Sequence, residues 1–489
     1  MQDNFKLYFI NQKKMKKITI SVIFLLLCHI ALGQITFEKT YGGSNYDYGY
    51  SVQQTNDNGY IITGYTKSFG AGSADVYLIK TDENGDTLWT KTYGGTKYDC
   101  GQFVQQTNDN GYIITGSTKS FGNDTSDVYL IKTDENGDTL WTKIYGGIDE
   151  DCGYSVRQTN DSGYVIAGET KSFGAGNFDV YLIKTDKNGD TLWTKTFGGI
   201  YDDKGYSMQQ TSDSGYIITG MTWSFGAGDN DAFLIKTDKN GDTLWTKTYG
   251  GSEKDYAYCV QQTNDNGYII TGLTWSFGAG SDDIYLIKTD ENGDTLWTKT
   301  FGGIYWEYGK SVEQTNDNGF IITGITWSYC VGYGDIYLIK TDENGDTSWT
   351  KTFGGSLWDY GRAIQKTNDN GYIIAGETKS SGAGAGDVYL IKTNKNGNII
   401  TKVNEINDSD VIQIYPNPGN GIFNLKIKNI KKGKLSIEII NVEGQLIYKK
   451  QFDSSPQTKK INLSNQAKGI YFVKIITSSN AVVKKIIIQ

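Results

Sequence analysis

One stretch of the chain recurs almost letter for letter: Asp75-Val-Tyr-Leu-Ile-Lys-Thr-Asp-Glu-Asn-Gly-Asp-Thr-Leu-Trp-Thr-Lys-Thr-Tyr-Gly-Gly95. Two runs rich in β-branched and aromatic residues flank an Asn-Gly turn, which is the pattern of a β-hairpin. Its tryptophans mark the period, each 52 residues after the last: Trp89, Trp141, Trp193, Trp245, Trp297 and Trp349. Such a period predicts a repeat architecture, because one unit cannot bury its apolar face alone.

Each repeat contains four strand candidates. In the first repeat they are Tyr50–Thr55, Gly59–Thr66, Asp75–Thr81 and Asp86–Tyr93, with Asn-Asp-Asn-Gly and Asp-Glu-Asn-Gly turns joining them in pairs. The repeats begin at Thr40, Thr92, Ile144, Thr196, Thr248, Thr300 and Thr352. Four strands in each repeat, repeated seven times, predict an all-β fold with a seven-bladed β-propeller.

The two ends of the array indicate how the ring closes. Before the first repeat lies Gln34-Ile-Thr-Phe-Glu-Lys-Thr-Tyr-Gly-Gly43, which matches a fourth strand without its hairpin partner. The last repeat degrades after its third strand, at Asn396-Gly-Asn-Ile-Ile-Thr-Lys402. We therefore expect the N-terminal strand to complete the last blade and leave no open edge. The segment Asn398–Lys402 is the alternative occupant of that edge, and an open solenoid with polar caps is the alternative fold.

The hairpin resembles the repeat of quinoprotein-like propellers, in which an Asp, a turn Gly and a Trp dock neighbouring blades. The matching residues are Asp82, Gly85 and Trp89 and their repeats. The resemblance implies the fold and no quinone chemistry, since vicinal cysteines are absent, so no cofactor is expected. The Asp-rich turns also resemble calcium loops, but Gly stands at the fourth position and not the sixth. This favours a turn role, with calcium as the open alternative and no metal ligand assigned.

The N-terminal residues have the pattern of a targeting segment. Lys13, Lys14, Lys16 and Lys17 precede an apolar run that ends in Ala31-Leu32-Gly33. This predicts a signal peptide over residues 1–33, removed before Gln34. A transmembrane helix is the alternative, but the run is short for one and no transmembrane segment is expected in the mature chain. Cleavage removes His29, the only histidine, which excludes His-based triads and His metal ligands.

The charge of the repeats argues against one class of partner, and the positions of the cysteines argue against a disulfide. The repeats are acidic, which argues against nucleic acid as a partner because phosphates require Lys and Arg. Four cysteines remain after cleavage: Cys100, Cys152, Cys259 and Cys330. A disulfide between Cys100 and Cys152 needs Cα atoms within about 7 Å, closer than equivalent positions of neighbouring blades usually lie. We expect free thiols.

Residues 404–489 differ in composition from the array (34–403) and form a second domain. This segment has 13 Lys, no Arg and six acids. Four motifs follow in order: Ile414-Tyr-Pro-Asn-Pro418 with Gly421-Ile-Phe-Asn-Leu-Lys-Ile427, then Ile437–Ile447, Lys468–Ile475 and Val482–Gln489. Together they resemble the type A sorting domain of the type IX secretion system of Bacteroidota. The resemblance implies a small β-sandwich, the type IX machinery as partner, and an extracellular or cell-surface location. An adhesive β-sandwich module is the alternative.

Near-identical copies allow an internal comparison, in which shared residues indicate scaffold and varied ones indicate function. Lys67, Lys119, Lys171 and Lys379 mark a position that becomes Trp223, Trp275 and Trp327 in blades four to six. The loops that lead into the first strands add Tyr201, Tyr305, Trp306 and Trp358. All lie on the face away from the hairpin turns, where they suit stacking on sugar rings or on a partner's apolar surface. The alternative is packing between blades.

Acidic residues are the second group of candidate functional residues. Every leading loop carries one: Asp47, Asp99, Asp151, Asp203, Asp255, Glu307 and Asp359. A carboxylate ring could hold a cation, but a repeated side-chain-to-backbone bond that caps each loop is favoured, as it is for Asp75 and its equivalents. Propeller glycosidases use a carboxylate pair, and Glu150, Glu169, Glu253 and Glu377 are acids that some blades have and others lack. Glu169 and Glu377 occupy the same repeat position in blades three and seven, which argues against their sharing one bond. The only arginines are Arg157 and Arg362, too few for the arginine cluster of a sialidase.

The sequence therefore predicts a secreted propeller that binds a glycan or surface partner without catalysis, and no catalytic residue is assigned. The ligand-binding residues predicted are Trp223, Trp275, Trp327, Tyr305, Trp306 and Trp358. Two alternatives stay open: a carbohydrate-active propeller enzyme, and a surface scaffold with no small ligand.

Overall fold

The computed structural model describes residues 34–123, 125–399, 412–427, 434–441, 445–453, 458–476 and 481–489. The predicted signal peptide lies outside these residues. The chain divides into two compact units, of which the first ends at Ile399. Every regular element in the described ranges is a β-strand, as predicted.

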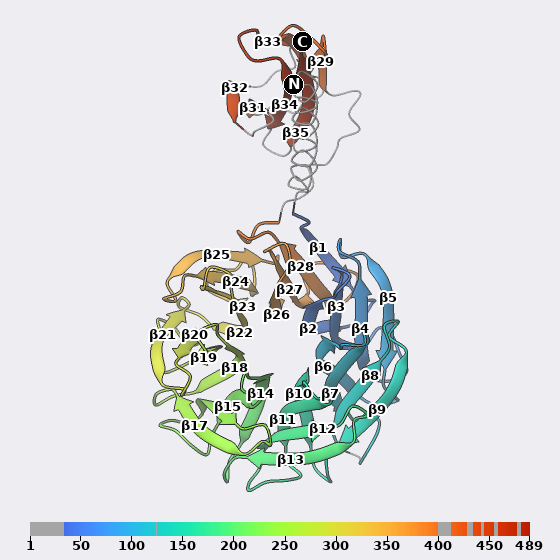
Figure 1. Cartoon of the computed structure of the whole chain (residues 1–489), viewed down its shortest axis with the longest axis vertical. Helices are drawn as coiled ribbons and strands as arrows, with labels where there is room; N and C mark the ends of the chain where they lie inside the picture. Colours follow the sequence, from blue (N-terminus) through green and yellow to red (C-terminus); the bar gives the residue numbers. More distant parts are fainter. Residues whose placement is uncertain are drawn as a thin grey trace, which may run out of the picture. The chain divides into compact units, whose positions relative to one another are not determined.

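The first unit contains seven four-stranded antiparallel sheets, set radially around one axis (Figure 1). From the axis outward, the first three are β2(Asp47–Gln54), β3(Tyr60–Thr66), β4(Asp75–Thr81), β5(Thr87–Tyr93); β6(Asp99–Gln106), β7(Tyr112–Thr118), β8(Asp127–Thr133), β9(Thr139–Tyr145); and β10(Asp151–Gln158), β11(Tyr164–Thr170), β12(Asp179–Thr185), β13(Thr191–Phe197).

The next three are β14(Asp203–Gln210), β15(Tyr216–Thr222), β16(Asp231–Thr237), β17(Thr243–Tyr249); β18(Asp255–Gln262), β19(Tyr268–Thr274), β20(Asp283–Thr289), β21(Thr295–Phe301); and β22(Glu307–Gln314), β23(Phe320–Thr326), β24(Asp335–Thr341), β25(Thr347–Phe353). The last sheet is β26(Asp359–Lys366), β27(Tyr372–Thr378), β28(Asp387–Thr393), β1(Phe37–Tyr41). The predicted seven-bladed propeller is therefore the architecture of this unit.

The inner strands begin three residues earlier than the sequence predicted. The predicted start was Tyr50, whereas β2 begins at Asp47, which pairs with Thr66 in the ladder. The acid looked like a loop residue because Asp is uncommon in strands. Its carboxylate accepts the N–H of Gly43 at 2.7 Å, so the same residue starts the strand and caps the loop before it.

The core of the propeller lies between neighbouring sheets. The two middle strands of each sheet are buried along their whole length, as in β3 and β4. Between the first two sheets, for example, Ile61 and Leu78 pack against Val104, Ile114 and Tyr129. Each blade thus buries its apolar residues against the blades on either side of it, as expected for a repeat array.

The outer hairpin fastens one blade to the next. The ring of Trp89 packs on the turn glycine of the following blade, where a Cβ built on Gly137 would lie 2.8 Å from Cζ3 of Trp89. Gly137 also has φ +77°, so both the contact and the backbone require glycine. Lys91 pairs with Asp138 at 2.7 Å and Tyr93 donates its hydroxyl to the carbonyl of Gly137 at 2.6 Å.

The N-terminal strand β1 completes the last sheet by pairing with β28, Phe37 opposite Lys392. It then repeats the contacts of a fourth strand on the first blade. Phe37 stands against Gly85 where other blades use Trp, Lys39 pairs with Asp86 at 2.7 Å, and Tyr41 bonds to Gly85 at 2.6 Å. The N-terminal strand therefore joins the first and last blades. Of the competing segment, residues 400–402 lie outside the described residues.

The second unit contains two sheets in its described residues. One is three-stranded, in the order β29(Ile412–Tyr415), β30(Ile422–Ile427), β33(Thr458–Asn462). The other is four-stranded, in the order β32(Leu446–Asp453), β31(Lys434–Asn441), β34(Gly469–Ile476), β35(Ala481–Ile488). One core draws on both sheets, with Phe423 and Ile461 from the first and Ile437 and Val473 from the second. This is the predicted small β-sandwich.

Candidate functional site

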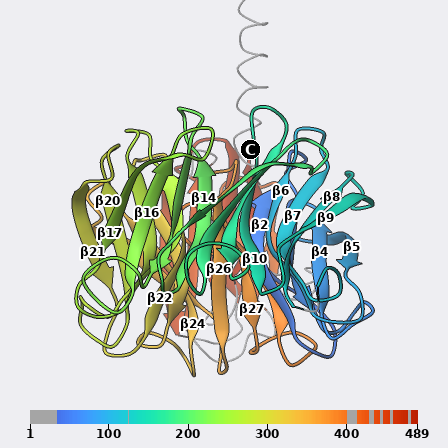
Figure 2. The same cartoon turned by 90° about the horizontal axis from the view of Figure 1, so that it is seen from below.

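The propeller strands run between two faces made of loops (Figure 2). We call "loop face" the one formed by the loops before the inner strands and the loops between second and third strands. The backbone ties these two loops together in each blade, since the N–H groups of Trp223, Trp275 and Trp327 donate to Asp202, Lys254 and Trp306 at 2.9–3.0 Å. Residues that vary between blades in these loops are thereby held side by side.

The acids of the leading loops cap those loops. Seven carboxylates each accept an N–H from the glycine four residues earlier at 2.7–2.9 Å: Asp47, Asp99, Asp151, Asp203, Asp255, Glu307 and Asp359. They are buried and repeat in every blade. The favoured interpretation as loop caps is confirmed for these residues.

Asp75 and its equivalents have the same role in the loop between second and third strands. The carboxylate of Asp75 accepts the N–H groups of Ala71 and Gly72 at 2.9 and 3.1 Å. Burial raises the pKa of Asp75, and the neighbouring carboxylate of Asp99 adds to the rise. Among the described residues no group of three or more metal-ligating side chains comes together.

Trp223 and Trp275 stand out from the loop face, with 49% and 47% of their surface exposed. The ring of Tyr201 lies 5.3 Å from that of Trp223, tilted by 34°. The ammonium of Lys254 lies 5.4 Å from the ring of Trp275. Both indoles are thus about half exposed beside a second aromatic or cationic group, a setting that suits stacking on a ligand.

Trp327 lies differently, at the centre of an aromatic cluster. Its ring meets those of Trp306 and Trp358 edge-on, at 5.9 and 5.8 Å. Its indole Nε1 is buried and donates no hydrogen bond to any described residue. Gly334 makes this position possible, since a Cβ there would lie 3.2 Å from Nε1. In the preceding blade Asp282 occupies the position of Gly334, and burial raises the pKa of its carboxyl group.

The rim of this cluster offers exposed rings. Trp306 is 48% exposed, and Tyr305 beside it is exposed as well. Tyr333 is exposed and stacks on Trp358, with ring centroids 5.9 Å apart and planes within 12°. Of the six predicted ligand-binding residues, the structure brings Trp306, Trp327 and Trp358 together. Tyr305 lies at their edge, while Trp223 and Trp275 belong to the two preceding blades.

The acids considered for catalysis are each held by a cation or exposed. Arg362 donates two hydrogen bonds to the buried Glu377, at 2.7 and 3.1 Å. Burial alone would lower the pKa of Arg362, but Glu377 raises it above the usual value. Glu169 accepts the hydroxyl of Tyr154 and pairs with Lys204, both at 2.9 Å. These contacts give both carboxylates structural partners, and the structure does not join them in one site.

A layer of side chains on the inner strands was missed in the sequence. It consists of Tyr50, Gln102, Tyr154, Tyr206, Tyr258, Lys310 and Arg362. Rings of neighbouring blades touch within it, as in the pair of Tyr154 and Tyr206 at 5.5 Å. The ammonium of Lys310 lies 3.5 Å from the ring centre of Tyr258, and burial lowers the pKa of Lys310 to about 7. Aligning the repeats would have found this position.

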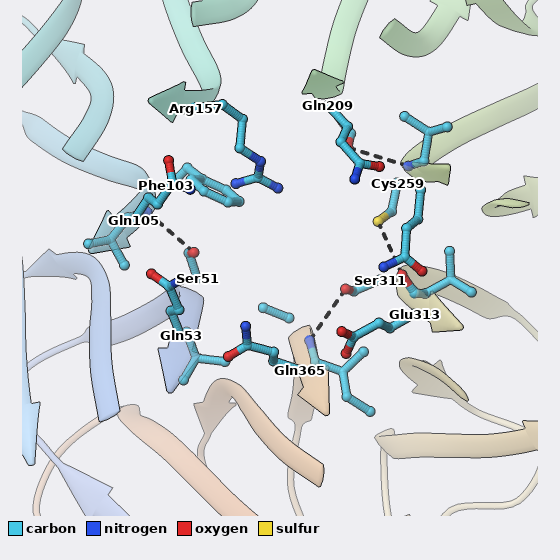
Figure 3. Close-up of a pocket in the computed structure, with 18 residues that line it drawn as sticks. Ser51, Gln53, Phe103, Gln105, Arg157, Gln209, Cys259, Ser311, Glu313 and Gln365 are labelled. Atoms are coloured by element: carbon cyan, nitrogen blue, oxygen red, sulfur yellow. Dashed lines mark hydrogen bonds between the residues drawn. The ribbon is translucent and has the colours of Figure 1, made fainter. Parts of the chain in front are cut away.

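Next to this layer along the inner strands, a cavity of about 300 Å³ lies on the axis (Figure 3). The strands β2, β6, β10, β14, β18, β22 and β26 line it. One repeat position supplies a ring of polar side chains: Gln53, Gln105, Arg157, Gln209, Gln261, Glu313 and Gln365. Arg157 is conspicuous in the sequence as one of two arginines, but its position on the axis was not predicted.

The four cysteines of the propeller are free thiols, as predicted. Burial raises the pKa of Cys100 to about 12 and also raises that of Cys152. Among the residues that the structure describes, none forms a helix of the length and apolarity that a membrane crossing requires.

The second unit matches a known protein family. Residues 413–489 match the family described as Secretion system C-terminal sorting domain. The chain therefore carries a type IX sorting domain at its C-terminal end, and this domain marks a secreted or cell-surface protein.

The chain is also similar to curated proteins at low sequence identity. The chain is 24% identical over 368 residues to the regulatory protein FlaEY of Caulobacter vibrioides, a match that covers 67% of this chain and 37% of that protein. The chain spans less than half the length of each of the curated relatives it matches.

Two solved structures are similar in fold. The Neurospora crassa Pan2 WD40 domain has 9% identity and a TM-score of 0.43, with 74% of this chain and 96% of that one covered. Sqt1 from Chaetomium thermophilum has 11% identity and a TM-score of 0.41, with coverages of 91% and 99%.

Proposed function

We propose that this protein is a secreted binding protein of a Bacteroidota species, whose propeller holds a glycan or a surface partner on the aromatic part of its loop face. The observation that carries the proposal is the exposure of Trp223, Trp275, Trp306 and Tyr305 over neighbouring blades. Exposed indoles with a free face suit stacking on the apolar face of a sugar ring. No catalytic step is required for this role.

The internal repeats support a role in binding over one in stability. Blades one, two, three and seven carry Lys where blades four to six carry Trp223, Trp275 and Trp327. Because the same backbone accepts a solvated Lys at this position, the fold itself does not require an indole there. A contiguous apolar group on a secreted protein indicates an interaction site.

The test is a glycan-array measurement with the full chain. Wild type should bind at least one glycan class. The double variant Trp223→Lys/Trp275→Lys, which installs the residue of the other blades, should weaken that binding about 10-fold or more, as stacking contributes on the order of 1.5 kcal/mol per ring pair.

The matched control is Leu244→Ser on an outer strand. Leu244 is 59% exposed and blade six carries Ser348 at its position, so this variant removes exposed apolar surface away from the loop face. It should bind like wild type. Absence of any glycan ligand would overturn the glycan assignment and favour a surface scaffold, whereas turnover of a bound glycan would favour the enzyme alternative.

A further inference from the structure

The ring of glutamines around the axial cavity is oriented by the backbone. Each Oε1 accepts an N–H group from the neighbouring blade: Gln53 from Gln106 at 2.6 Å, Gln105 from Gln158 at 2.8 Å, Gln209 from Gln262 at 2.7 Å, Gln261 from Gln314 at 2.6 Å and Gln365 from Gln54 at 2.6 Å. Because a backbone N–H can only donate, the atom it meets must be the amide oxygen. The five –NH₂ groups are left as the free ends of these side chains.

These five amide nitrogens have no acceptor among the described residues of the propeller. All five side chains line the cavity, and Figure 3 shows Gln53, Gln105, Gln209 and Gln365 around its open centre. Each –NH₂ carries two donor hydrogens. The cavity is therefore lined by hydrogen-bond donors without matching protein acceptors.

Arg157 adds a positive charge to this ring. Its guanidinium cannot accept the hydrogen bond that glutamine accepts at this position, and it instead lies over the ring of Phe103, with Cζ 4.1 Å from the ring centre. Phe103 itself replaces a residue that is Ser in four other blades. Arg157 and Phe103 both differ from the usual residue of the repeat. The ring of Phe103 stabilises the guanidinium of Arg157 through a cation–π contact.

The charge of Arg157 is uncompensated. Its only hydrogen bond among the described residues is from Nη1 to the carbonyl of Val156, at a long 3.4 Å, which leaves most of its five donor hydrogens free. Burial lowers the pKa of Arg157 to about 10. A partly buried cation without a partner is costly, and a bound anion would offset that cost.

Glu313 is the one acid of the ring. One of its oxygens accepts the N–H of Lys366, as a glutamine oxygen does in the other blades. Burial raises the pKa of Glu313 to about 7. It lies three blades from Arg157 along the ring, and no ion pair joins the two among the described residues.

We propose that the axial cavity binds a small oxyanion, a carboxylate or a phosphate, between the guanidinium of Arg157 and the amide groups of the glutamine ring. Arg157 supplies the charge and the planar pair of donors that such anions accept, the glutamines complete the hydrogen bonding, and Glu313 limits the affinity by repulsion. This site is separate from the loop-face residues and does not rest on the proposed glycan binding.

The repeat itself supplies variants that keep the fold. Arg157→Gln makes this blade like five others and gives the N–H of Gln210 the acceptor that its counterparts have. Glu313→Gln likewise completes the ring and replaces the repelling acid by a further donor. The two changes should act in opposite directions on anion binding.

The experiment is isothermal titration of the full chain at pH 7 with inorganic phosphate and, separately, with acetate, at ionic strength held constant with chloride. At least one probe should bind, and which one binds distinguishes phosphate from carboxylate recognition. Arg157→Gln should weaken binding about 10- to 100-fold, as expected for losing hydrogen bonds to a charged group. Glu313→Gln should strengthen it several-fold.

The control for net charge is Lys91→Gln, which removes a cation of the outer strand that pairs with Asp138, and it should leave the affinity unchanged. The melting temperature of each variant verifies folding. The proposal is overturned if wild type binds neither probe, if Arg157→Gln binds like wild type, or if Glu313→Gln binds more weakly.

Discussion

The outer strand and the inner strand of each blade come from the same 52-residue repeat, but they differ in how uniform they are. The tryptophan of each outer strand from β5 to β25 packs on the turn glycine of the next blade, and in all of them but β25 a lysine pairs with the aspartate of that turn. The strand β1 repeats this docking with Phe37 in place of Trp. The inner strands instead vary from Gln to Arg157 and Glu313 at one position. The residues at equivalent positions are the same in most blades where a side chain must fit the neighbouring blade. They differ between blades where the side chain faces the axis or solvent.

The largest effect should come from removing the closing strand. Deletion of residues 34–43 leaves the edge of β28 unpaired and uncovers the core around Phe37 and Tyr41. Since loss of one buried Phe side chain costs about 3–5 kcal/mol, the deletion should lower the free energy of unfolding by more than about 5 kcal/mol. Denaturant unfolding with and without the segment measures this, and unchanged stability would show that another segment closes the ring.

A single methyl group in the outer hairpin should have the next largest effect. Gly137→Ala places a Cβ against Trp89 at a positive φ, which should cost about 2–4 kcal/mol through strain and overpacking. Glu135→Lys in the same turn reproduces the Lys187 of another blade and should be neutral in the same unfolding experiment. Equal stability of the two variants would contradict the docking role of the turn glycine.

The substitution Glu313→Gln should increase the free energy of unfolding by an amount that depends on pH. The pKa of Glu313 is raised from 4.5 to about 7 by burial, so in the folded protein it binds a proton more tightly than in the unfolded chain. Its contribution to stability is therefore full below pH 4.5 and is lost as the pH rises through 7. The variant should be more stable than wild type by about 1–3 kcal/mol at pH 8, with a smaller difference at pH 5, as measured by urea unfolding. A difference independent of pH would contradict this.

The smallest effect on stability is expected on the loop face. Trp275→Lys should change the free energy of unfolding by less than about 0.5 kcal/mol, as is usual for exposed positions. The same substitution at Trp89, which packs on the next blade, should cost several kcal/mol. A large loss of stability in the Trp275→Lys variant would mean that the contact of Trp275 with Lys254 serves the fold.

The outer half of each blade could be predicted from the sequence because its signals are local. The turn residues, the alternation and the spare strand at Phe37–Tyr41 each have a short-range pattern, and the structure agrees with them. The sorting domain was predictable for a different reason, since four motifs occur in order along residues 413–489.

The axial ring could not be placed in the same way, because the inner strands contain a bulge. The ladder shifts between Gly49 and Ser51 in β2, and at the same place in the other inner strands. A bulge changes which side chains face a given side, so simple alternation fails from Tyr50 onward. The position of Trp327 was equally hidden, since it depends on Gly334, which lies at the other end of the loop between β23 and β24.

The most direct test of the division between fold and binding is one unfolding curve. A variant with Arg157→Gln, Glu313→Gln, Trp223→Lys and Trp275→Lys returns four varied positions to residues that other blades carry. At pH 8 its free energy of unfolding should equal or exceed that of wild type, because none of the four residues is retained for stability. A loss of more than about 2 kcal/mol, well above the effect of ordinary surface substitutions, would show that these residues hold the propeller together and would contradict the account.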